Sequence, residues 1–405
     1  MRVVMVTPYP SATGTAKNMS AVARYAADLV KHIALEDKDT EIIIVSEIVD
    51  EPSAETDVAV QRVFRRCAPD FDVTLFDAIV KLKPDVAHFQ HELFMYGGIF
   101  SALKMPRLFS RLRQHGIAVA VTIHGVIPIA DFTPRFMKVN RIRGFAWIAR
   151  RVYRVLMRRI VAHSNVVIVH EERLRQLLRN DYSCNASSIE VVHMGIPALS
   201  SLPEIPDAKQ LFCVAGKPTL LFFGYLAGYK GIDLLLRAIP TIQRTIPDIR
   251  LLIAGTVPAR MQGSMQAEAV IAELRTLAKP SGKEAVCFLG YVPDTDVPAL
   301  LRAAELLVFP YLTAMSTSYA MAQAISAGSP FIASAPFAAL LGDASFYFDL
   351  TPQSIAEAVI AYFTQPQLRA RVASDVRRLS ATRSTSDAAR RTAALYATMV
   401  PHRVA

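Results

Sequence analysis

The sequence predicts an α/β protein made of two doubly wound domains that face each other across a cleft. Short apolar runs alternate with longer amphipathic stretches, which is the pattern of βαβ units. The same alternation starts again in the second half of the chain. Between the two series lies a polar stretch with several prolines, at 197–216, which has the composition of a linker. A chain of 405 residues has room for two such domains.

Ten short apolar runs are predicted to be buried parallel strands. They are Val3–Val6, Ile42–Val45, Val86–Phe89, Ala118–Ile123 and Val166–Val169 in the first half, and Thr219–Phe223, Arg250–Ala254, Ala285–Phe288, Leu306–Phe309 and Phe331–Ala333 in the second. Amphipathic stretches between them, such as Ala21–Ile33 and Asp77–Leu82, predict helices. We expect domains at 1–200 and 214–380, with a last helix within 381–405 that packs back on the first domain.

The composition is that of a globular protein, with 52% hydrophobic and 20% charged residues. The first apolar run ends at Thr7-Pro8, which is too short for a signal peptide, and no apolar stretch reaches the roughly 18 to 20 residues of a membrane span. The four cysteines are scattered, without the spacing of metal ligands. We therefore expect a cytoplasmic protein without a metal or other cofactor.

The positive charge is concentrated in one region. Thirteen lysines and arginines lie between Ser101 and Ile160 against a single acid, Asp131, whereas the whole chain has a net charge of +10. Such a block indicates an anionic partner: nucleic acid, a phospholipid surface or a phosphorylated acceptor. No helix-turn-helix, zinc-finger or RNP motif is present, so we do not expect nucleic acid.

A helix predicted over 141–160 divides this region into two faces. The basic face carries Arg143, Trp147, Arg150, Arg151, Arg154 and Arg158, and the face expected to pack in the core carries Ile142, Phe145, Ile148, Val152, Val155 and Leu156. A solvated face usually mixes acids with bases, and this one has no acid. We therefore expect the basic face to contact an anionic membrane surface or a phosphorylated acceptor.

Eight segments, in order, resemble the GT-B glycosyltransferases, in particular the family-four group of retaining enzymes. The first half contains VTPYPSATGTAKNMSAVARYAADLV, PDVAHFQHELFMYGG, VAVTIHGV and IEVVHMGIP, and the second contains FFGYLAGYKGIDLLLRAIP, IRLLIAG, FLGYVPDTDVPALLRAAELLVFPY and AMAQAISAGSPFIAS. The resemblance covers about residues 1 to 350. Gln90-His91-Glu92 followed by Gly97-Gly98 is similar to a subgroup often found in polysaccharide gene neighbourhoods.

The resemblance implies two Rossmann-like domains and a metal-independent hexosyltransferase. The enzyme would move a hexosyl group from a nucleoside diphosphate sugar to a hydroxyl of a lipid-linked or polysaccharide acceptor. It would act in exopolysaccharide, other polysaccharide or glycolipid biosynthesis, peripherally associated with the inner face of the membrane. A catalytically silent GT-B protein that binds glycans or serves as a scaffold, and a GT-B sugar-nucleotide epimerase, are the alternatives.

The resemblance also assigns site residues. A diphosphate held without a metal needs glycine backbone, helix N-termini and a fixed cation. The implied donor-binding residues are Gly14, Thr15, Gly224, Tyr225, Lys230, Val292, Ser316, Thr317, Ser318 and Gln323. Lys230 would neutralise the leaving diphosphate, and His124 would lie against the transferred sugar, so these two are the catalytic candidates. His91 and Glu92 are either an acceptor-activating pair or a structural network.

The sequence departs from the family pattern at three donor positions. The family's Glu-x7-Glu motif falls on Met315 and Gln323, and its phosphate-binding arginine is replaced by Tyr225. A charge-assisted hydrogen bond contributes about 1.5–3 kcal/mol, so either another cation compensates, Arg260 being one candidate, or catalysis is weak. These departures leave open whether the reaction retains or inverts the anomeric configuration.

Overall fold

The computed structural model describes residues 1–10, 21–48, 58–93, 95–139, 142, 144–195, 202–258, 263–282, 284–314, 318–341 and 346–400. They form two compact units. The first unit contains the described residues up to Gly195 and those from Thr385 onward, and the second contains the described residues of 202–314 and 318–384.

The first unit is built on a seven-stranded parallel sheet with the order β3-β2-β1-β4-β5-β6-β7. Its strands are β1 (Arg2–Val6), β2 (Glu41–Glu47), β3 (Ala59–Phe64), β4 (Val86–His91), β5 (Ala118–Ile123), β6 (Val166–Val169) and β7 (Ile189–Val191). Every residue of β4, and nearly every residue of β1 and β5, is buried. Continuous burial of this kind is typical of parallel sheets that carry helices on both faces.

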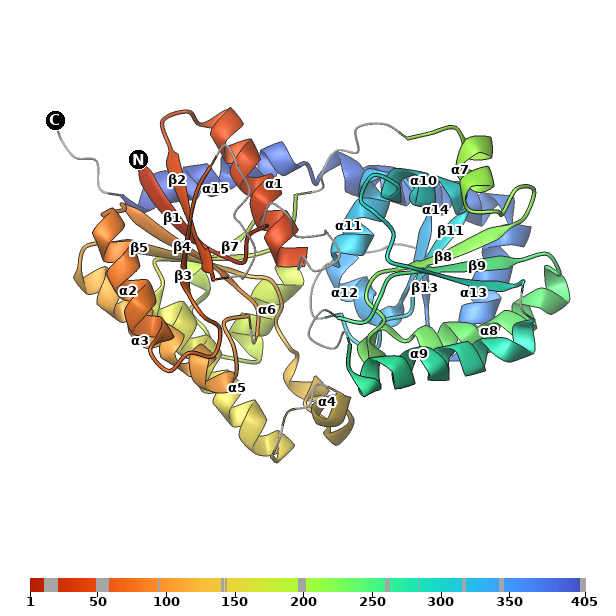
Figure 1. Ribbon diagram of the computed structural model, residues 1–405, viewed down its shortest axis with the longest axis horizontal. Helices are drawn as coiled ribbons and strands as arrows, with labels where there is room; N and C mark the ends of the chain where they lie inside the picture. Colours follow the sequence, from red (N-terminus) through yellow and green to blue (C-terminus); the bar gives the residue numbers. More distant parts are fainter. Residues whose placement is uncertain are drawn as a thin grey trace. The chain divides into compact units, whose positions relative to one another are not determined.

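Helices cover both faces of the first sheet (Figure 1). They are α1 (Ala21–Glu36), α2 (Phe71–Leu82), α3 (Ile99–Gln114), α4 (Pro134–Val139), α5 (Ala146–His163), α6 (Glu172–Asn180) and α15 (Thr385–Met399). On one face α1 packs against α15, and on the other α3 packs against both α2 and α5. The last described helix therefore completes the first unit. At its start, a Cβ added to Gly195 would lie 2.8 Å from the Cα of Thr385.

The second unit has a six-stranded parallel sheet with the order β10-β9-β8-β11-β12-β13. The strands are β8 (Thr219–Phe223), β9 (Arg250–Ala254), β10 (Val286–Gly290), β11 (Leu306–Phe309), β12 (Phe331–Ser334) and β13 (Tyr347–Phe348). The helices are α7 (Ile205–Leu211), α8 (Ile232–Thr245), α9 (Met265–Ala278), α10 (Val297–Ala303), α11 (Tyr319–Ser326), α12 (Ala338–Leu341), α13 (Pro352–Thr364) and α14 (Pro366–Ala381). Helix α8 packs against α9 and α13, and α11 packs against α14.

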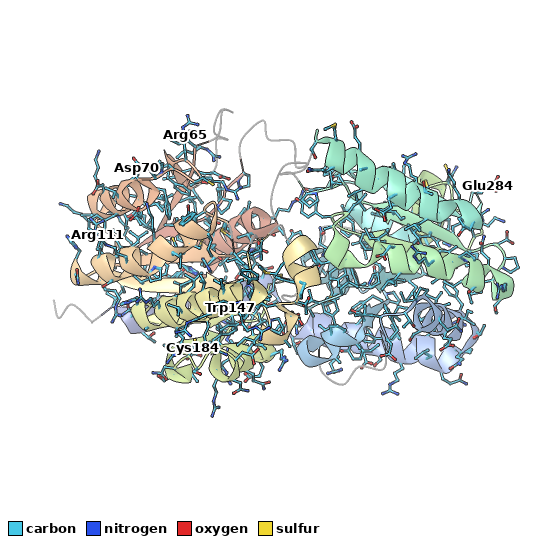
Figure 2. The ribbon with its side chains drawn as sticks, turned by 90° about the horizontal axis from the view of Figure 1, so that it is seen from below. Arg65, Asp70, Arg111, Trp147, Cys184 and Glu284 are labelled. Atoms are coloured by element: carbon cyan, nitrogen blue, oxygen red, sulfur yellow. The ribbon has the colours of Figure 1, made fainter. Side chains whose placement is uncertain are left out.

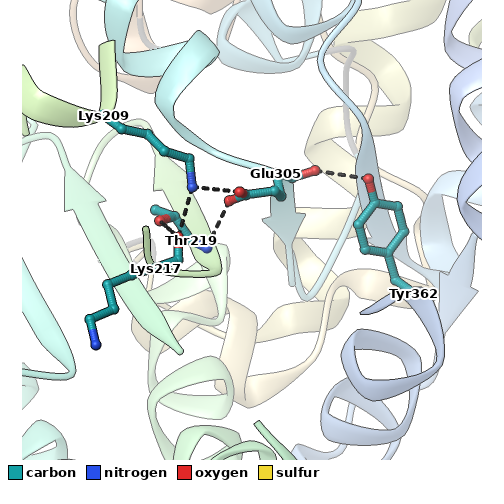
Figure 3. A network of polar contacts seen from close by, with 5 residues as sticks. All are labelled: Lys209, Lys217, Thr219, Glu305 and Tyr362. Carbon is teal, nitrogen blue, oxygen red and sulfur yellow. Dashed lines mark hydrogen bonds and ion pairs between the residues drawn. The ribbon is translucent and has the colours of Figure 1, made fainter. Parts of the chain in front are cut away.

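A polar network joins the amino-terminal ends of β8 and β11 in the second sheet (Figure 3). The buried Lys209 of α7 forms an ion pair with Glu305, which precedes β11, and also donates to the carbonyl of Lys217 at 2.7 Å. The other oxygen of Glu305 accepts from the amide of Thr219, the first residue of β8, at 2.8 Å. The hydroxyl of Tyr362 donates to the carbonyl of Glu305 at 2.9 Å. This network lies at the amino-terminal ends of the strands, whereas a site is expected at their carboxyl-terminal ends. We therefore assign the network a role in stability.

The prediction of two parallel, doubly wound sheets is confirmed, and all ten predicted strands are present with bounds shifted by at most two residues. Three strands were not predicted: β3, β7 and β13. Each is the outermost strand of its sheet. β7 and β13 have three and two residues, and β3 is interrupted by Gln61 and Arg62, so these sequences lack the continuous hydrophobic run on which the prediction depended. The fourth outermost strand, β10, was predicted.

Candidate functional site

In both sheets the strand order reverses once, and a doubly wound fold binds its ligand at that point, beyond the carboxyl ends of the strands. The reversal lies between β1 and β4 in the first unit and between β8 and β11 in the second. Gly14 and Thr15, which follow β1, lie outside the described residues, as do Arg260, Met315, Ser316 and Thr317. At the two reversal points, residues of the loops after β4, β8 and β11 do lie within the described ranges.

Two glycines shape the loop after β8. Gly224 has φ +135°, in the region that favours glycine, and Gly231 has φ +63°. A Cβ on Gly231 would lie 2.0 Å from the carbonyl oxygen of Pro310, which follows β11. The amide of Leu312 donates to the carbonyl of Tyr229 at 2.8 Å. The loops after β8 and β11 therefore touch through their backbones, on either side of the reversal point.

Lys230 lies in this contact and is held by aromatic rings. It is only 6% exposed, although lysine usually keeps its ammonium in water. Its Nζ lies 3.6 Å from the centre of the Tyr311 ring and 5.2 Å from that of Tyr229. Cation–π contacts of this kind hold an ammonium in one position. The second sheet thus presents a fixed positive charge at its reversal point.

Ser318 connects this lysine site to the N-terminus of α11. Its Oγ accepts from the amide of Met321 at 3.4 Å, as an N-cap, and lies 3.0 Å from the Tyr311 hydroxyl. Burial raises the pKa of Tyr311 far above its ordinary value, so this hydroxyl is neutral. Gln323, further along α11, and Val292, after β10, are both buried, whereas Tyr225 is partly exposed. Tyr311 was not among the predicted site residues.

In the first unit, His124 follows β5 and belongs to a buried hydrogen-bonded chain. Its Nε2 lies 2.8 Å from Oε1 of Gln90, and its Nδ1 lies 3.1 Å from Nε2 of His170, which follows β6. The Nδ1 of His170 donates to the carbonyl of Val192 at 3.0 Å. The ring of Tyr25, on α1, meets both histidine rings edge-on. Both nitrogens of His124 are thus bonded within the chain, so it is well suited to hold the site's shape.

The chain continues toward the last helix. Gln90 lies 3.4 Å from Nε2 of His88, whose Nδ1 lies 2.6 Å from the Tyr396 hydroxyl of α15. Burial lowers the pKa of His88 to about 3, with a smaller effect of the neighbouring His170. Burial, reinforced by His170, also holds the pKa of His124 well below its ordinary value. These two imidazoles are therefore neutral at physiological pH.

His91, the last residue of β4, differs from the other histidines of this region. It is 2% exposed, and neither ring nitrogen has a hydrogen-bond partner among the described residues. Burial lowers its pKa to about 4, so the ring is neutral. Leaving a buried polar group unsatisfied costs about 1–3 kcal/mol, which calls for a partner that the described part of the chain does not supply. Glu92 is exposed, so the structure does not join His91 and Glu92 as a hydrogen-bonded pair.

His170 and Glu171 were not predicted, although the sequence carries a signal for them. Both directly follow the strand Val166–Val169, as His124 follows its own strand. The carboxylate of Glu171 is buried and lies 3.5 Å from Nδ1 of His193, a residue that follows β7. Polar residues at the carboxyl end of a buried parallel strand are candidates for a site in any doubly wound domain.

Two family models match the two halves of the chain. The model described as Glycosyltransferase Family 4 matches residues 22–198, and the model described as Glycosyl transferases group 1 matches residues 217–365. Two solved structures are similar over nearly the whole chain. HepE from Anabaena, in complex with UDP and glucose, covers 98% of this chain and 100% of its own, with a TM-score of 0.70 and 14% identity. Sucrose-phosphate synthase from Thermosynechococcus elongatus covers 98% of both chains, with a TM-score of 0.76 and 16% identity.

The chain has the GT-B glycosyltransferase fold. The resemblance predicted from the eight segments is confirmed at this level, and the finer subgroup assignment stays a prediction. Among curated relatives, a phosphatidyl-myo-inositol mannosyltransferase of Mycobacterium leprae is 30% identical over 142 residues. That alignment covers 35% of this GT-B chain and 33% of the relative, so it spans about a third of each protein.

The basic helix of this GT-B protein differs from its prediction in one respect. Helix α5 begins at Ala146, and its first buried residue is Tyr153; the others are Leu156, Met157, Ile160 and Val161. Of the predicted core face, Leu156 is buried, but Phe145, Ile148 and Val155 are exposed, Phe145 to 68%. The prediction was wrong because it continued one apolar stripe along residues 141–160, whereas the helix packs on the unit only from Tyr153 onward, through the side that carries Tyr153, Met157 and Ile160.

The exposed side of α5 combines apolar and basic side chains. Trp147 is 65% exposed (Figure 2), and Arg151, Arg154 and Arg158 are exposed as well. Arg150 is half-buried and donates to the carbonyl of Phe132 at 3.4 Å, while Arg143 lies outside the described residues. None of the helices in the described part of the chain is long and apolar enough to cross a membrane.

Among the described residues of this GT-B fold, no three histidine, cysteine, aspartate or glutamate side chains are grouped so as to hold a metal ion. Metal independence therefore stays a prediction.

Proposed function

We propose that this GT-B protein transfers a hexosyl group from a nucleoside diphosphate sugar to a hydroxyl of a lipid-linked or polysaccharide acceptor. The observation that carries the proposal is the buried ammonium of Lys230, held 3.6 Å from the Tyr311 ring centre at the reversal point of the second sheet. A fixed cation at this place suits the charge that develops on a leaving diphosphate. The relatives named as a mannosyltransferase and a sucrose-phosphate synthase, and the HepE complex with UDP and glucose, support this class of reaction.

In this proposal the second unit binds the donor without its usual carboxylates. Lys230 faces the diphosphate, and the N-terminus of α11, capped by Ser318, supplies backbone amides to an anionic or hydroxyl oxygen. Gln323 stands where the family's second glutamate would, and its amide suits a ribose hydroxyl. Gly14, Thr15, Ser316 and Thr317 are proposed to complete the donor site. No metal ion is proposed.

The first unit is proposed to bind the transferred sugar and the acceptor. Because both ring nitrogens of His124 are bonded to Gln90 and His170, we assign it a positioning role at the sugar. His91 is the better candidate for direct contact, since it is neutral and neither of its nitrogens has a partner within the described ranges. A neutral imidazole is able to accept the proton of an attacking hydroxyl.

Contact with an anionic membrane is also part of the proposal. Trp147 and the arginines of α5 form an exposed surface that combines apolar and basic groups, as interfacial helices do. Each arginine near an anionic bilayer contributes about 1 kcal/mol, and salt screens the effect. Vesicle sedimentation tests this point. Equal binding to neutral and anionic vesicles would remove the membrane from the proposal.

A catalytically silent GT-B protein is the second candidate, favoured by Tyr225 and Gln323 in place of charged family residues. Calorimetric titration with UDP, GDP and their sugars, followed by transfer assays with an acceptor extract, separates the two candidates. The enzyme binds one nucleotide and turns over its sugar. A silent protein binds glycan or nucleotide without transferring or hydrolysing it, and an epimerase changes the sugar of the free donor without an acceptor.

A further inference from the structure

A concave site apart from the candidate donor site lies within the first unit, at the C-terminal end of α5. It is a pocket of about 480 Å³ between the last turns of α3 and α5 and the loop that precedes β7. Its polar lining residues include Arg113, Arg158, Arg159, Ser183, Asn185 and Ser188, and Cys184, labelled in Figure 2, also lines it. The volume falls within the range of small-molecule sites. We refer to it as the arginine pocket.

The arginine pocket carries positive charge that the described part of the chain does not balance. None of its lining residues is acidic, and none of its three arginines forms an ion pair with a described carboxylate. Some exposed basic groups of the same unit pair with acids, as Arg2 does with Glu41 and Arg175 with Glu172. The pocket instead brings three arginines without such a partner together around one concave site.

The end of a helix is the simplest alternative partner for these arginines. The carboxyl terminus of α5 faces the pocket, and Nη1 of Arg113 donates to the carbonyl of Ala162 at 3.4 Å. A helix C-terminus is equivalent to about half a negative charge. Three arginines against that half charge leave a surplus of about 2.5 positive charges, so the helix end does not account for them.

The neutral groups of the pocket also suit an anion. The Asn185 Oδ1 accepts from both the amide and the hydroxyl of Ser187, at 3.1 and 3.0 Å, which leaves the Asn185 NH₂ as a donor. Ser183 and Ser188 contribute hydroxyls. Burial raises the pKa of the Cys184 thiol to about 11, with Arg158 opposing the shift, so this side chain does not add a negative charge.

We propose that the arginine pocket binds a phosphomonoester or diphosphate group. This site is separate from the donor site, and it shares Arg158 with the proposed membrane surface of α5. Guanidinium groups match phosphate oxygens in pairs, and amide and hydroxyl donors complete the shell. Such a group comes either from a soluble phosphorylated metabolite or from the headgroup of an acidic lipid. Trp147 is eleven residues before Arg158 on the same helix, about 16 Å along its axis.

Binding of inorganic phosphate and pyrophosphate, measured by calorimetry on the full chain, tests the proposal. The test variant is Arg158→Gln with Arg159→Gln, and the matched control is Arg391→Gln, an exposed arginine of α15 in the same unit. All titrations are made in a Lys230→Met background, which removes the cation of the donor site. We expect the control to bind like its background and the double variant to bind at least tenfold more weakly. Equal binding by all three would overturn the proposal.

Two further arms make the test specific. Asn185→Asp keeps the oxygen that accepts from Ser187 but adds a negative charge, so it should also weaken pyrophosphate binding in a protein of unchanged melting temperature. Phosphatidylcholine vesicles containing phosphatidic acid are compared with vesicles containing phosphatidylglycerol. Preference for phosphatidic acid, lost in the double variant, assigns the pocket to a lipid headgroup. Loss of pyrophosphate binding alone assigns it to a soluble metabolite. If Asn185→Asp and the double variant both bind pyrophosphate normally, the pocket is not an anion site.

Discussion

Replacing Lys230 with methionine should weaken the binding of a nucleoside diphosphate without unfolding the second unit. Methionine keeps an apolar side chain of similar length between Tyr229 and Tyr311, so packing is largely conserved, and only the ammonium is lost. Because Lys230 is 6% exposed and held against a ring, its charge is already in place before the ligand binds. Little binding energy is then spent on ordering this side chain.

The expected magnitude follows from one lost charge-assisted contact. Such a contact contributes about 1.5–3 kcal/mol, which is a rise of roughly 10- to 150-fold in the dissociation constant. Calorimetry with UDP or GDP measures it, with melting temperature as the folding check. Lys217→Met is the control, since Lys217 is a lysine of the same unit that pairs with Asp248 at 2.7 Å, next to the opposite edge of the sheet. An unchanged dissociation constant for Lys230→Met would refute its place at the diphosphate.

Three predictions concern stability. Gly231→Ala should lower the melting temperature, because the added Cβ would lie 2.0 Å from a backbone oxygen. The control is Gly216→Ala, where φ is also positive but no atom lies within 4 Å of the added Cβ, so the melting temperature should fall clearly less. Similar losses in the two variants would contradict the close contact. The folded chain keeps His88 and His91 unprotonated at pH values where the unfolded chain protonates them, because burial lowers their pKa values to about 3 and 4 from 6.5. The free energy of unfolding should therefore fall as the pH drops from 6.5 toward 4, by up to about 1.4 kcal/mol per pH unit for each histidine, and His91→Leu should make this slope shallower in denaturant titrations. Glu305→Ala should cost about 1–3 kcal/mol in the same assay, since it leaves a buried ammonium and a backbone amide without their carboxylate; a loss below about 0.5 kcal/mol would contradict the role given to this network.

The sequence predicted the central strands of both sheets because a strand buried on both faces has to be apolar throughout. It missed β3, β7 and β13, three of the four edge strands, because an edge strand is under no such constraint. Gly224, Lys230 and Ser318 were predicted as site residues because they follow central strands in family-like segments. The partners that fix their geometry were missed, since they are distant in the sequence: Tyr311 is far from Lys230, and His170 is 46 residues from His124. Local sequence patterns do not indicate contacts between residues that are far apart along the chain.

The core face of α5 was predicted wrongly for a related reason. Amphipathic periodicity indicates which side of a helix is apolar, but not how much of that side meets a neighbouring element. Here the helix packs only from Tyr153 onward, and Phe145, Ile148 and Val155 stay exposed. That difference is informative for function, because it adds apolar side chains to the surface that carries Trp147 and the arginines.

The return of α15 to the first unit has a consequence for how the protein is made. Tyr396 is fully buried, and its hydroxyl lies 2.6 Å from Nδ1 of His88 on a central strand. Ala388 packs against Ile168 and Val192 of the same unit. A ribosome synthesises the whole second unit between these partners, a separation of 308 residues for His88 and Tyr396. The first unit therefore cannot finish folding before the second unit has been synthesised, unlike the usual order in which an amino-terminal domain folds first. Until the last described helix leaves the ribosome, the face of the first sheet that carries α1 lacks α15 and is incompletely covered. Apolar surface exposed in this way favours aggregation of the nascent chain.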